Sequence, residues 1–219
     1  MPEARYRAVI FDMDGVLADS EPAHFEATNN VLGRYGKSLT REQQKLQMGL
    51  GHAAGIEATI RDSGVELTPE QLADEYDTEL LAVLSRGSTP LPGAVSLVVR
   101  LREMGIPVAL ASSSLPAWIE ATVAGIGLTG RFDAVVSGET VPHPKPAPDI
   151  YLRAAELIGV PAAECIAIED SPAGLTAVKA AGMLAVQVCS SSDAFPPQPE
   201  AAIVLDSLED FDMALLASE

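Results

Sequence analysis

Cysteine and long hydrophobic runs are scarce in this chain of 219 residues. The two cysteines, Cys165 and Cys189, lie in apolar stretches without metal-ligand spacing, so we expect buried thiols and no disulfide scaffold. No apolar run approaches the length that spans a bilayer, and no signal-peptide pattern precedes the first expected strand. These absences predict a globular protein located in the cytoplasm.

Positive charge is also in short supply. The chain has 14 Lys and Arg residues against 31 Asp and Glu residues, which gives a net charge of -17. Such a surface repels nucleic acid phosphates and anionic lipids, and no local basic patch offsets it. We therefore expect neither nucleic acid nor a membrane as a partner, and an anionic substrate would need a local cation. No feature of the sequence sets the oligomeric state, and a monomer is our default expectation.

From residue 90 onward, short apolar runs alternate with amphipathic stretches. This alternation is typical of a parallel sheet covered by helices on both faces, so the predicted fold class is α/β, with a Rossmann-like, doubly wound core. The expected strands are 6–14, 106–112, 132–137, 165–170, 183–188 and 201–206. The expected helices between and after them are 94–104, 115–125, 147–158, 171–181 and 208–217.

The interval 20–88 breaks this rhythm, because it contains helical stretches and no convincing strand. We expect helices at 21–35, 40–47, 53–63 and 69–84, and a stiff proline-rich connector at 89–93. Ser20 is the predicted N-cap of the first helix, and Thr68 with Gln71 forms a predicted capping box on the last. The sequence thus predicts a core made of 1–19 and 89–219, with a helical domain, 20–88, inserted into it.

Two aspartates follow the first expected strand directly. Successive side chains of a strand point to opposite faces, so Asp12 and Asp14 should share a face while Met13 enters the core. Two like charges on one face need something positive between them. Gly15 comes next and allows a sharp turn away from the strand, as an ordinary turn glycine also would.

Other polar residues are expected at the ends of neighbouring strands. Ser112 ends one strand, Glu169 and Asp170 end another, and a proline-flanked turn carries Lys145 just before a helix. Parallel sheets bind ligands at the carboxyl ends of their strands, so these groups should meet in one crevice. Magnesium prefers such a set, with one or two carboxylates, waters and a substrate phosphate.

This set predicts phosphoryl transfer. An ionised Asp12 can attack phosphorus, Asp14 can protonate the leaving oxygen and then activate water, and Ser112 and Lys145 can hold the phosphoryl oxygens. Each residue has a simpler explanation, since Asp12 and Asp14 suit a turn and Asp170 suits a helix start. Independent turns and caps would not place polar motifs at successive strand ends, and Lys145 between prolines has no simple structural role.

Four segments carry a family resemblance: FDMDGVLADSEP (11–22), ALASSS (109–114), HPKPAPDIY (143–151) and IEDSPAGLTAVKAAGM (168–183). They resemble the haloacid dehalogenase-like (HAD) phosphotransferases, in the helical-cap subgroup of β-phosphoglucomutase and small sugar-phosphate or phosphoglycolate phosphatases. The resemblance implies Asp12 as nucleophile, Asp14 as acid and base, and Ser112 and Lys145 as phosphate ligands. It further implies Mg²⁺ bound by Asp12, the Asp14 carbonyl, Asp170 and, directly or through water, Glu169.

The inserted helical domain, 20–88, is the expected cap, and it lacks the cations that a phosphomutase needs for a second phosphate. The loop 47–52 offers His52 where the mutase resemblance would expect arginine, Leu115 stands where a lysine would help, and 69–84 contains no Lys or Arg. We therefore expect a phosphatase that hydrolyses a small phosphomonoester, such as a sugar phosphate, through an aspartyl-phosphate. A β-phosphoglucomutase-like mutase is the alternative; a dehalogenase or an inactive binding module fits the intact acids and lysine less well.

The cap also supplies candidate contacts to the small phosphorylated metabolite. His24 could gate Asp14 or touch substrate, or could be a polar residue on a helix face, and the sequence leaves both readings open. Ser113 and Ser114, which follow Ser112, are expected to form turn hydrogen bonds only. Four further cations, Arg34, Lys37, Arg41 and Lys45, should form a solvated face. The candidate substrate-binding residues are Ser20, His24, Gly49, His52 and Ser113.

Overall fold

The computed structural model describes residues 6–47, 49–189 and 195–216. Its main sheet has six parallel strands in the order β5-β4-β1-β6-β7-β8. Along the chain these strands are β1 (Ala8–Phe11), β4 (Val108–Ser112), β5 (Ala134–Ser137), β6 (Cys165–Glu169), β7 (Leu184–Val188) and β8 (Ile203–Leu205). The predicted α/β fold class is confirmed, and β1 lies between the two other strands that end in polar motifs.

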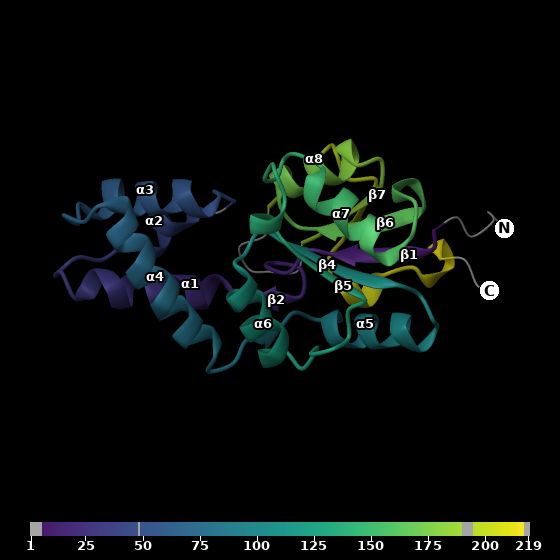
Figure 1. Ribbon diagram of the computed structural model, residues 1–219, viewed down its shortest axis with the longest axis horizontal. Helices are drawn as coiled ribbons and strands as arrows, with labels where there is room; N and C mark the ends of the chain where they lie inside the picture. Colours follow the sequence, from purple (N-terminus) through teal and green to yellow (C-terminus); the bar gives the residue numbers. More distant parts are fainter. Residues whose placement is uncertain (1–5, 48, 190–194, 217–219) are drawn as a thin grey trace.

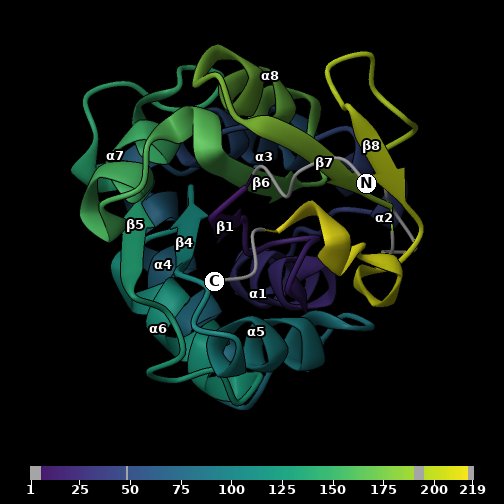
Figure 2. The ribbon, with the colours of Figure 1, turned by 90° about the vertical axis from the view of Figure 1, so that its right-hand side faces the viewer.

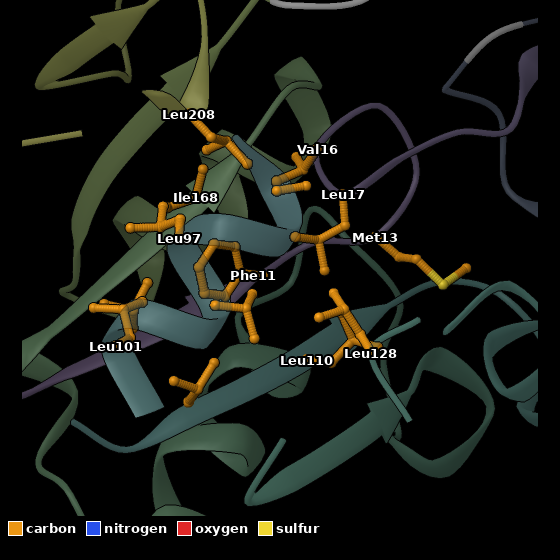
Figure 3. Packing of buried hydrophobic residues seen from close by; sticks show 14 of the residues in the cluster. Phe11, Met13, Val16, Leu17, Leu97, Leu101, Leu110, Leu128, Ile168 and Leu208 are labelled. Carbon is orange, nitrogen blue, oxygen red and sulfur yellow. The ribbon is translucent and has the colours of Figure 1, made fainter. Parts of the chain in front are cut away.

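Helices cover both faces of this sheet, α5 and α6 on one side and α7 and α8 on the other (Figure 2). They are α5 (Ala94–Glu103), α6 (Pro116–Gly125), α7 (Asp149–Ile158) and α8 (Pro172–Ala180). Figure 3 shows Phe11 of β1 among Leu97, Leu101, Leu110 and Ile168. Burial of each such side chain stabilises the fold by about 1.5–3 kcal/mol, so the alternating faces of β1 fix its register.

Four helices, α1 (Glu21–Gly33), α2 (Arg41–Lys45), α3 (His52–Ser63) and α4 (Pro69–Leu84), lie together at the carboxyl ends of the strands (Figure 1). They have an apolar cluster of their own, which includes Leu32 of α1, Ile56 of α3 and Leu72 of α4. The predicted capping box is confirmed, because Thr68 accepts a hydrogen bond from the Gln71 main chain and the Gln71 side chain accepts one from Thr68.

The structure places Ser20 at the N-cap position of α1, as predicted, but its side chain forms no capping hydrogen bond. Pro22 has no N–H to offer, and the N–H of Ala23 bonds to the main-chain oxygen of Ser20 instead.

Two features of the elements differ from what the sequence predicted. The expected helix at 208–217 is replaced, within the described residues, by two 3₁₀ turns, Leu208–Asp210 and Met213–Leu215. Ser207 and Asp212 each accept a hydrogen bond from the main chain two residues later, and these local bonds compete with a continuous helix. The connectors to the inserted helices also form a short antiparallel pair, β2 (Ala18–Asp19) with β3 (Thr89–Pro90), which the sequence did not predict.

Within the described part of the chain, no helix is both long enough and apolar enough to cross a membrane. The cytoplasmic location stays a prediction.

Candidate active site

A cavity of about 470 Å³ lies where the strand ends face helices α1 to α4. Asp12 and Asp14 line it, together with Lys145, Glu169 and Asp170. Met13, between the two aspartates, is buried in the core as predicted. The structure therefore brings the polar motifs of three separate strand ends and the Lys145 turn into one site.

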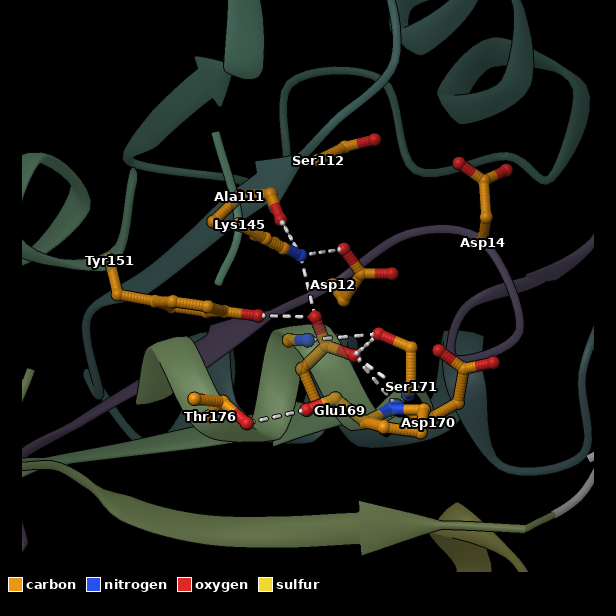
Figure 4. Close-up of polar contacts among 12 residues, drawn as sticks. Asp12, Asp14, Ala111, Ser112, Lys145, Tyr151, Glu169, Asp170, Ser171 and Thr176 are labelled. Carbon is orange, nitrogen blue, oxygen red and sulfur yellow. Dashed lines mark hydrogen bonds and ion pairs between the residues drawn. The ribbon is translucent and has the colours of Figure 1, made fainter. Parts of the chain in front are cut away.

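Lys145 is the cation that joins these motifs (Figure 4). Its Nζ donates hydrogen bonds to Asp12 Oδ1 at 2.6 Å, to Glu169 Oε1 at 2.6 Å and to the Ala111 carbonyl at 3.3 Å. Burial alone lowers the pKa of Lys145, but the carboxylates of Asp12 and Glu169 outweigh burial and raise it. Lys145 is thus held in its charged form between two acidic strand ends.

Glu169 is fully buried at the end of β6, inside the first turn of α8. Its Oε1 accepts hydrogen bonds from Lys145 and from the Tyr151 hydroxyl, and its Oε2 accepts from Ser171 and from the Asp170 main chain. Burial raises its pKa, yet Lys145 and these hydrogen bonds outweigh burial and lower it. A Cβ at Gly174 would lie 1.7 Å from Glu169 Oε1, so only glycine leaves room for this carboxylate.

Three carboxylates form a group that could hold a metal ion: Asp12, Glu169 and Asp170 each offer an oxygen within 4.8 Å of the others. Burial, together with Glu169 and Asp14, raises the pKa of Asp12 to about 8 against the opposing effect of Lys145. Burial and the neighbouring acids also raise the pKa of Asp170. Crowded carboxylates of this kind are hard oxygen donors that favour a divalent cation, so the donor set fits the predicted metal site.

Gly15 makes this crowding possible. Its φ is +77°, and a Cβ there would lie 2.2 Å from Asp170 Oδ2. The glycine therefore serves both a turn and a close approach to an acidic side chain of the site.

The serines after β4 differ from one another in their placement. Ser114 Oγ donates to Asp14 Oδ2 at 2.9 Å, so the expectation that Ser114 forms only turn hydrogen bonds is wrong. Ser113 and Ser114 line the cavity. Ser112 is 1% exposed, accepts a hydrogen bond from the Ser114 main chain and is absent from the described cavity lining. The role of Ser112 as a phosphate ligand stays a prediction.

Histidine, tyrosine and tryptophan rings from α1, α3, α4 and α6 line one side of the cavity. His24 Nδ1 and the Tyr76 hydroxyl are 2.6 Å apart, and His52 Nε2 and Asp77 Oδ1 are 2.7 Å apart. Trp118, on core helix α6, meets the Tyr76 ring edge-on at a centroid distance of 5.8 Å and donates to the Asp77 carbonyl at 3.3 Å. Of the two readings of His24, the structure supports a position in the cavity.

The remaining substrate-binding candidates from the cap, Ser20 and Gly49, also line the cavity. Gly49 has a φ of +76° and faces the Phe195 ring, which a Cβ there would approach to 3.5 Å. Met48, in the same loop, lies outside the described residues. Arg34 pairs with Glu75 and Glu79 away from the cavity, as expected for a solvated face.

The sequence did not predict a role for several residues in or beside the site. Tyr76 and Trp118 lie in helices, where an aromatic residue usually signals packing, so no local signal distinguished them, and Tyr151 stood out only as the last residue of the segment 143–151. Gln187 did have a signal, because it interrupts the apolar run of β7. It is fully buried, its Nε2 donates to the Pro196 carbonyl at 3.1 Å, and its Oε1 accepts from the Gln198 main chain at 2.8 Å. These bonds hold the segment 195–198, in which Phe195 lines the cavity.

Comparison with known proteins agrees with this geometry. The model of the haloacid dehalogenase-like hydrolase family matches residues 6–182. Fructose-1-phosphate phosphatase YqaB from Escherichia coli is 38% identical over 84% of this chain and 97% of its own length. Beta-phosphoglucomutase from Bacillus subtilis is 31% identical over 97% of this chain and 95% of its own.

A solved structure is similar over almost the full chain. CbbY from Rhodobacter sphaeroides, in a complex with xylulose-(1,5)bisphosphate, superposes with a TM-score of 0.86 at 26% identity and covers 97% of this chain and 99% of its own. The present chain belongs to the haloacid dehalogenase-like hydrolases. The predicted membership in the β-phosphoglucomutase-like subgroup and the prediction of an enzyme are confirmed.

Proposed function

We propose that the protein is a magnesium-dependent phosphatase that hydrolyses a small phosphomonoester, such as a sugar phosphate, through an aspartyl-phosphate on Asp12. The observation that carries the proposal is that the buried side chain of Lys145 contacts both Asp12 and Glu169 where these residues line the cavity. The phosphatase named among the relatives supports the same reaction class.

The metal would be held by the acidic strand ends. Asp12, Asp170 and the Asp14 carbonyl are the proposed direct ligands. Glu169 already shares its two oxygens among five donors, which favours contact through water. Bound there, Mg²⁺ supplies positive charge that favours the ionised form of Asp12 and balances the charge of the phosphoryl group.

The two half-reactions use Asp12 and Asp14 in turn. In the first, a bond forms between an Asp12 oxygen and phosphorus while the bond to the leaving oxygen breaks, and Asp14 gives that oxygen its proton. In the second, Asp14 takes a proton from water, which attacks phosphorus and frees Asp12 and phosphate. Lys145 and Ser112 hold the phosphoryl oxygens, where charge is concentrated. The hydrogen bond from Ser114 to Asp14 supports the orientation of the acid.

We further propose that 20–88 acts as a cap on a core formed by 1–19 and 89–219. The cap would close on the paired connectors β2 and β3 and exclude water while Asp12 is phosphorylated. Ser20, His24, Gly49, His52 and Ser113 would contact the bound metabolite, since all five line the cavity.

A phosphomutase is the second candidate, because a beta-phosphoglucomutase is among the relatives. A mutase must hold a second phosphate as well as the transferred one. Among the described residues that line the cavity, Lys145 is the only Lys or Arg, and it is already bound to Asp12 and Glu169. The charge of the cavity therefore favours the phosphatase.

The proposal is tested by phosphate release from small phosphomonoesters, including β-glucose 1-phosphate and phosphoglycolate, with magnesium and with a chelator. We expect release that requires magnesium and is lost in Asp12→Asn. No release from any ester would contradict the proposal, and turnover with a sugar bisphosphate primer would then establish the mutase. Near-normal release by folded Asp12→Asn would overturn the assignment of the nucleophile.

A further inference from the structure

A buried tyrosine contacts the charged groups of the site from outside the cavity. Tyr151, in α7, is fully buried and is not among the described residues that line the cavity. Its hydroxyl donates a hydrogen bond to Glu169 Oε1 at 2.8 Å (Figure 4). Nζ of Lys145 lies over its ring, 5.0 Å from the centroid, which is within the range of a cation–π contact. Tyr151 therefore touches both groups without entering the space that a substrate would fill.

Lys145 and Tyr151 share one oxygen of Glu169. Nζ of Lys145 donates to the same Oε1 at 2.6 Å, whereas Oε2 accepts from Ser171 and from the Asp170 main chain. Within the described part of the chain, Oε1 thus has two donors, and both come from side chains. A buried acceptor that loses all its donors is costly. If Lys145 leaves Oε1, the Tyr151 hydroxyl keeps this oxygen paired.

The proposed reaction requires Lys145 to change partners. An ammonium group has three hydrogens, and in this structure Nζ has three acceptors: Asp12 Oδ1, Glu169 Oε1 and the Ala111 carbonyl. A bond from Nζ to a phosphoryl oxygen therefore needs one of these acceptors to be released. Asp12 is the proposed nucleophile, and its negative charge holds Lys145 beside the reacting atoms. Glu169 Oε1 has a second donor in Tyr151, so its release leaves no buried group unpaired.

We propose that Tyr151 is a positioning residue, whose hydroxyl holds Glu169 in place while Lys145 transfers a hydrogen bond from Glu169 to the bound phosphoryl group. The inference rests on the proposed phosphatase function and adds to it a residue that acts through Lys145. Tyr151→Phe removes the hydroxyl and keeps the ring beside Lys145. In this variant Oε1 has Lys145 alone, so phosphate binding would leave a buried carboxylate oxygen without a donor.

The first experiment measures kcat/KM for acetyl phosphate and the inhibition constant of inorganic phosphate, both with magnesium. In Tyr151→Phe we expect kcat/KM to fall and the inhibition constant to rise, each by about tenfold or more, the size of one hydrogen bond to a charged group. Tyr35→Phe is the matched control. Tyr35 also donates to a carboxylate, that of Glu75, but it is exposed on the cap and lies outside the described lining, so both values should stay unchanged.

A double-mutant cycle with Lys145→Ala separates an effect through Lys145 from a purely structural one. If Tyr151 acts by freeing Lys145, Tyr151→Phe should change kcat/KM less than about twofold in the Lys145→Ala background. An equal loss in both backgrounds would overturn the inference, because Tyr151 would then act independently of the lysine. If the double variant is too inactive or too unstable to assay, calorimetric titration of Tyr151→Phe with inorganic phosphate and magnesium decides, and an affinity equal to that of the wild type would overturn the inference.

The same measurements separate this inference from the proposed function. Failure of the wild-type protein to hydrolyse acetyl phosphate with magnesium would contradict the phosphatase itself. An active wild type, together with unchanged kinetics and phosphate affinity in Tyr151→Phe, would overturn the inference alone and would mean that Lys145 releases the Ala111 carbonyl instead. A lower free energy of unfolding for Tyr151→Phe with unchanged phosphate affinity would also overturn it, and would leave the hydroxyl with a structural role only.

Discussion

At the scale of single residues, the site depends on how charge is balanced around one buried lysine. Nζ of Lys145 lies 2.6 Å from an oxygen of Asp12 and 2.6 Å from an oxygen of Glu169. The side chains of Lys145, Asp12 and Glu169 are 8%, 9% and 0% exposed, respectively. Loss of the cation would leave two buried carboxylates without their partner, at a cost of about 3–5 kcal/mol for a broken buried pair. The same loss would remove the cation proposed to hold the phosphoryl oxygens.

Lys145→Ala should therefore lower both activity and stability. We expect kcat/KM to fall by about 100-fold or more, and the free energy of unfolding to fall by about 3 kcal/mol in the metal-free protein. Arg34→Ala, which removes two solvent-accessible ion pairs on the cap, should change either quantity little. Phosphate-release kinetics and urea unfolding give the two values, and comparable activity losses in both variants would mean that cap cations bind the phosphate.

The sequence predicted the acids and the lysine of the site but not the contacts that orient them. Asp12 and Lys145 stood out because they follow or flank expected strand ends. The partner of Asp14 is a serine 100 residues away, and the partners of Glu169 include the hydroxyl of Tyr151 in α7. Such pairings depend on the register of the strands and on the angle of a helix, which no local pattern contains.

At the scale of elements, the strand ends and the helices that follow them together position the side chains of the site. The predicted strands were confirmed because each is an apolar run, and β1, β4 and β6 are buried on both faces, whereas β5 and β8 each have one exposed residue. The short pair β2 and β3 was not predicted because strands of two residues are too short to show a periodic pattern. The segment 208–217 was predicted as a helix from the spacing of its apolar residues, but Ser207 and Asp212 cap two separate turns there. The first turn of α8 holds Glu169 only because residue 174 is glycine.

Two glycine substitutions should have opposite effects. Gly174→Ala places a methyl group on the Glu169 carboxylate and should lower the free energy of unfolding by about 1–3 kcal/mol and displace Lys145, with loss of activity. Gly33→Ala, in α1, has no atom within 4 Å of the new Cβ and should stabilise the protein by up to about 1 kcal/mol. Thermal unfolding and phosphate release test both, and an active, stable Gly174→Ala would contradict the packing described for Glu169.

At the scale of the whole molecule, a net charge of -17 surrounds a site that must accept an anion. The acids outside the site repel phosphate over long range, so the site itself must supply the compensating charge. Lys145 provides one positive charge, and the group of Asp12, Glu169 and Asp170 could hold a metal ion that provides more. Metal binding to the folded protein should then stabilise it by mass action.

Magnesium should raise the melting temperature of the wild-type protein. Saturation at about 100 times the dissociation constant corresponds to roughly 2.7 kcal/mol of stabilisation. Asp170→Asn should lose most of this increase, whereas Asp74→Asn, on the exposed face of α4, should keep it. An equal increase in all three proteins would mean that magnesium acts by screening the negative surface and not by binding at the strand ends.

The central claim is that Asp12 becomes phosphorylated, and a trapped phosphoenzyme tests it most directly. Asp14→Asn should still be phosphorylated by p-nitrophenyl phosphate, whose good leaving group needs no proton, but should hydrolyse the intermediate slowly. Mass spectrometry of the acid-quenched protein should then find a phosphoryl group on the peptide that contains Asp12. Release of p-nitrophenol at a normal rate without any such adduct in Asp14→Asn, or an adduct on another residue, would contradict the account.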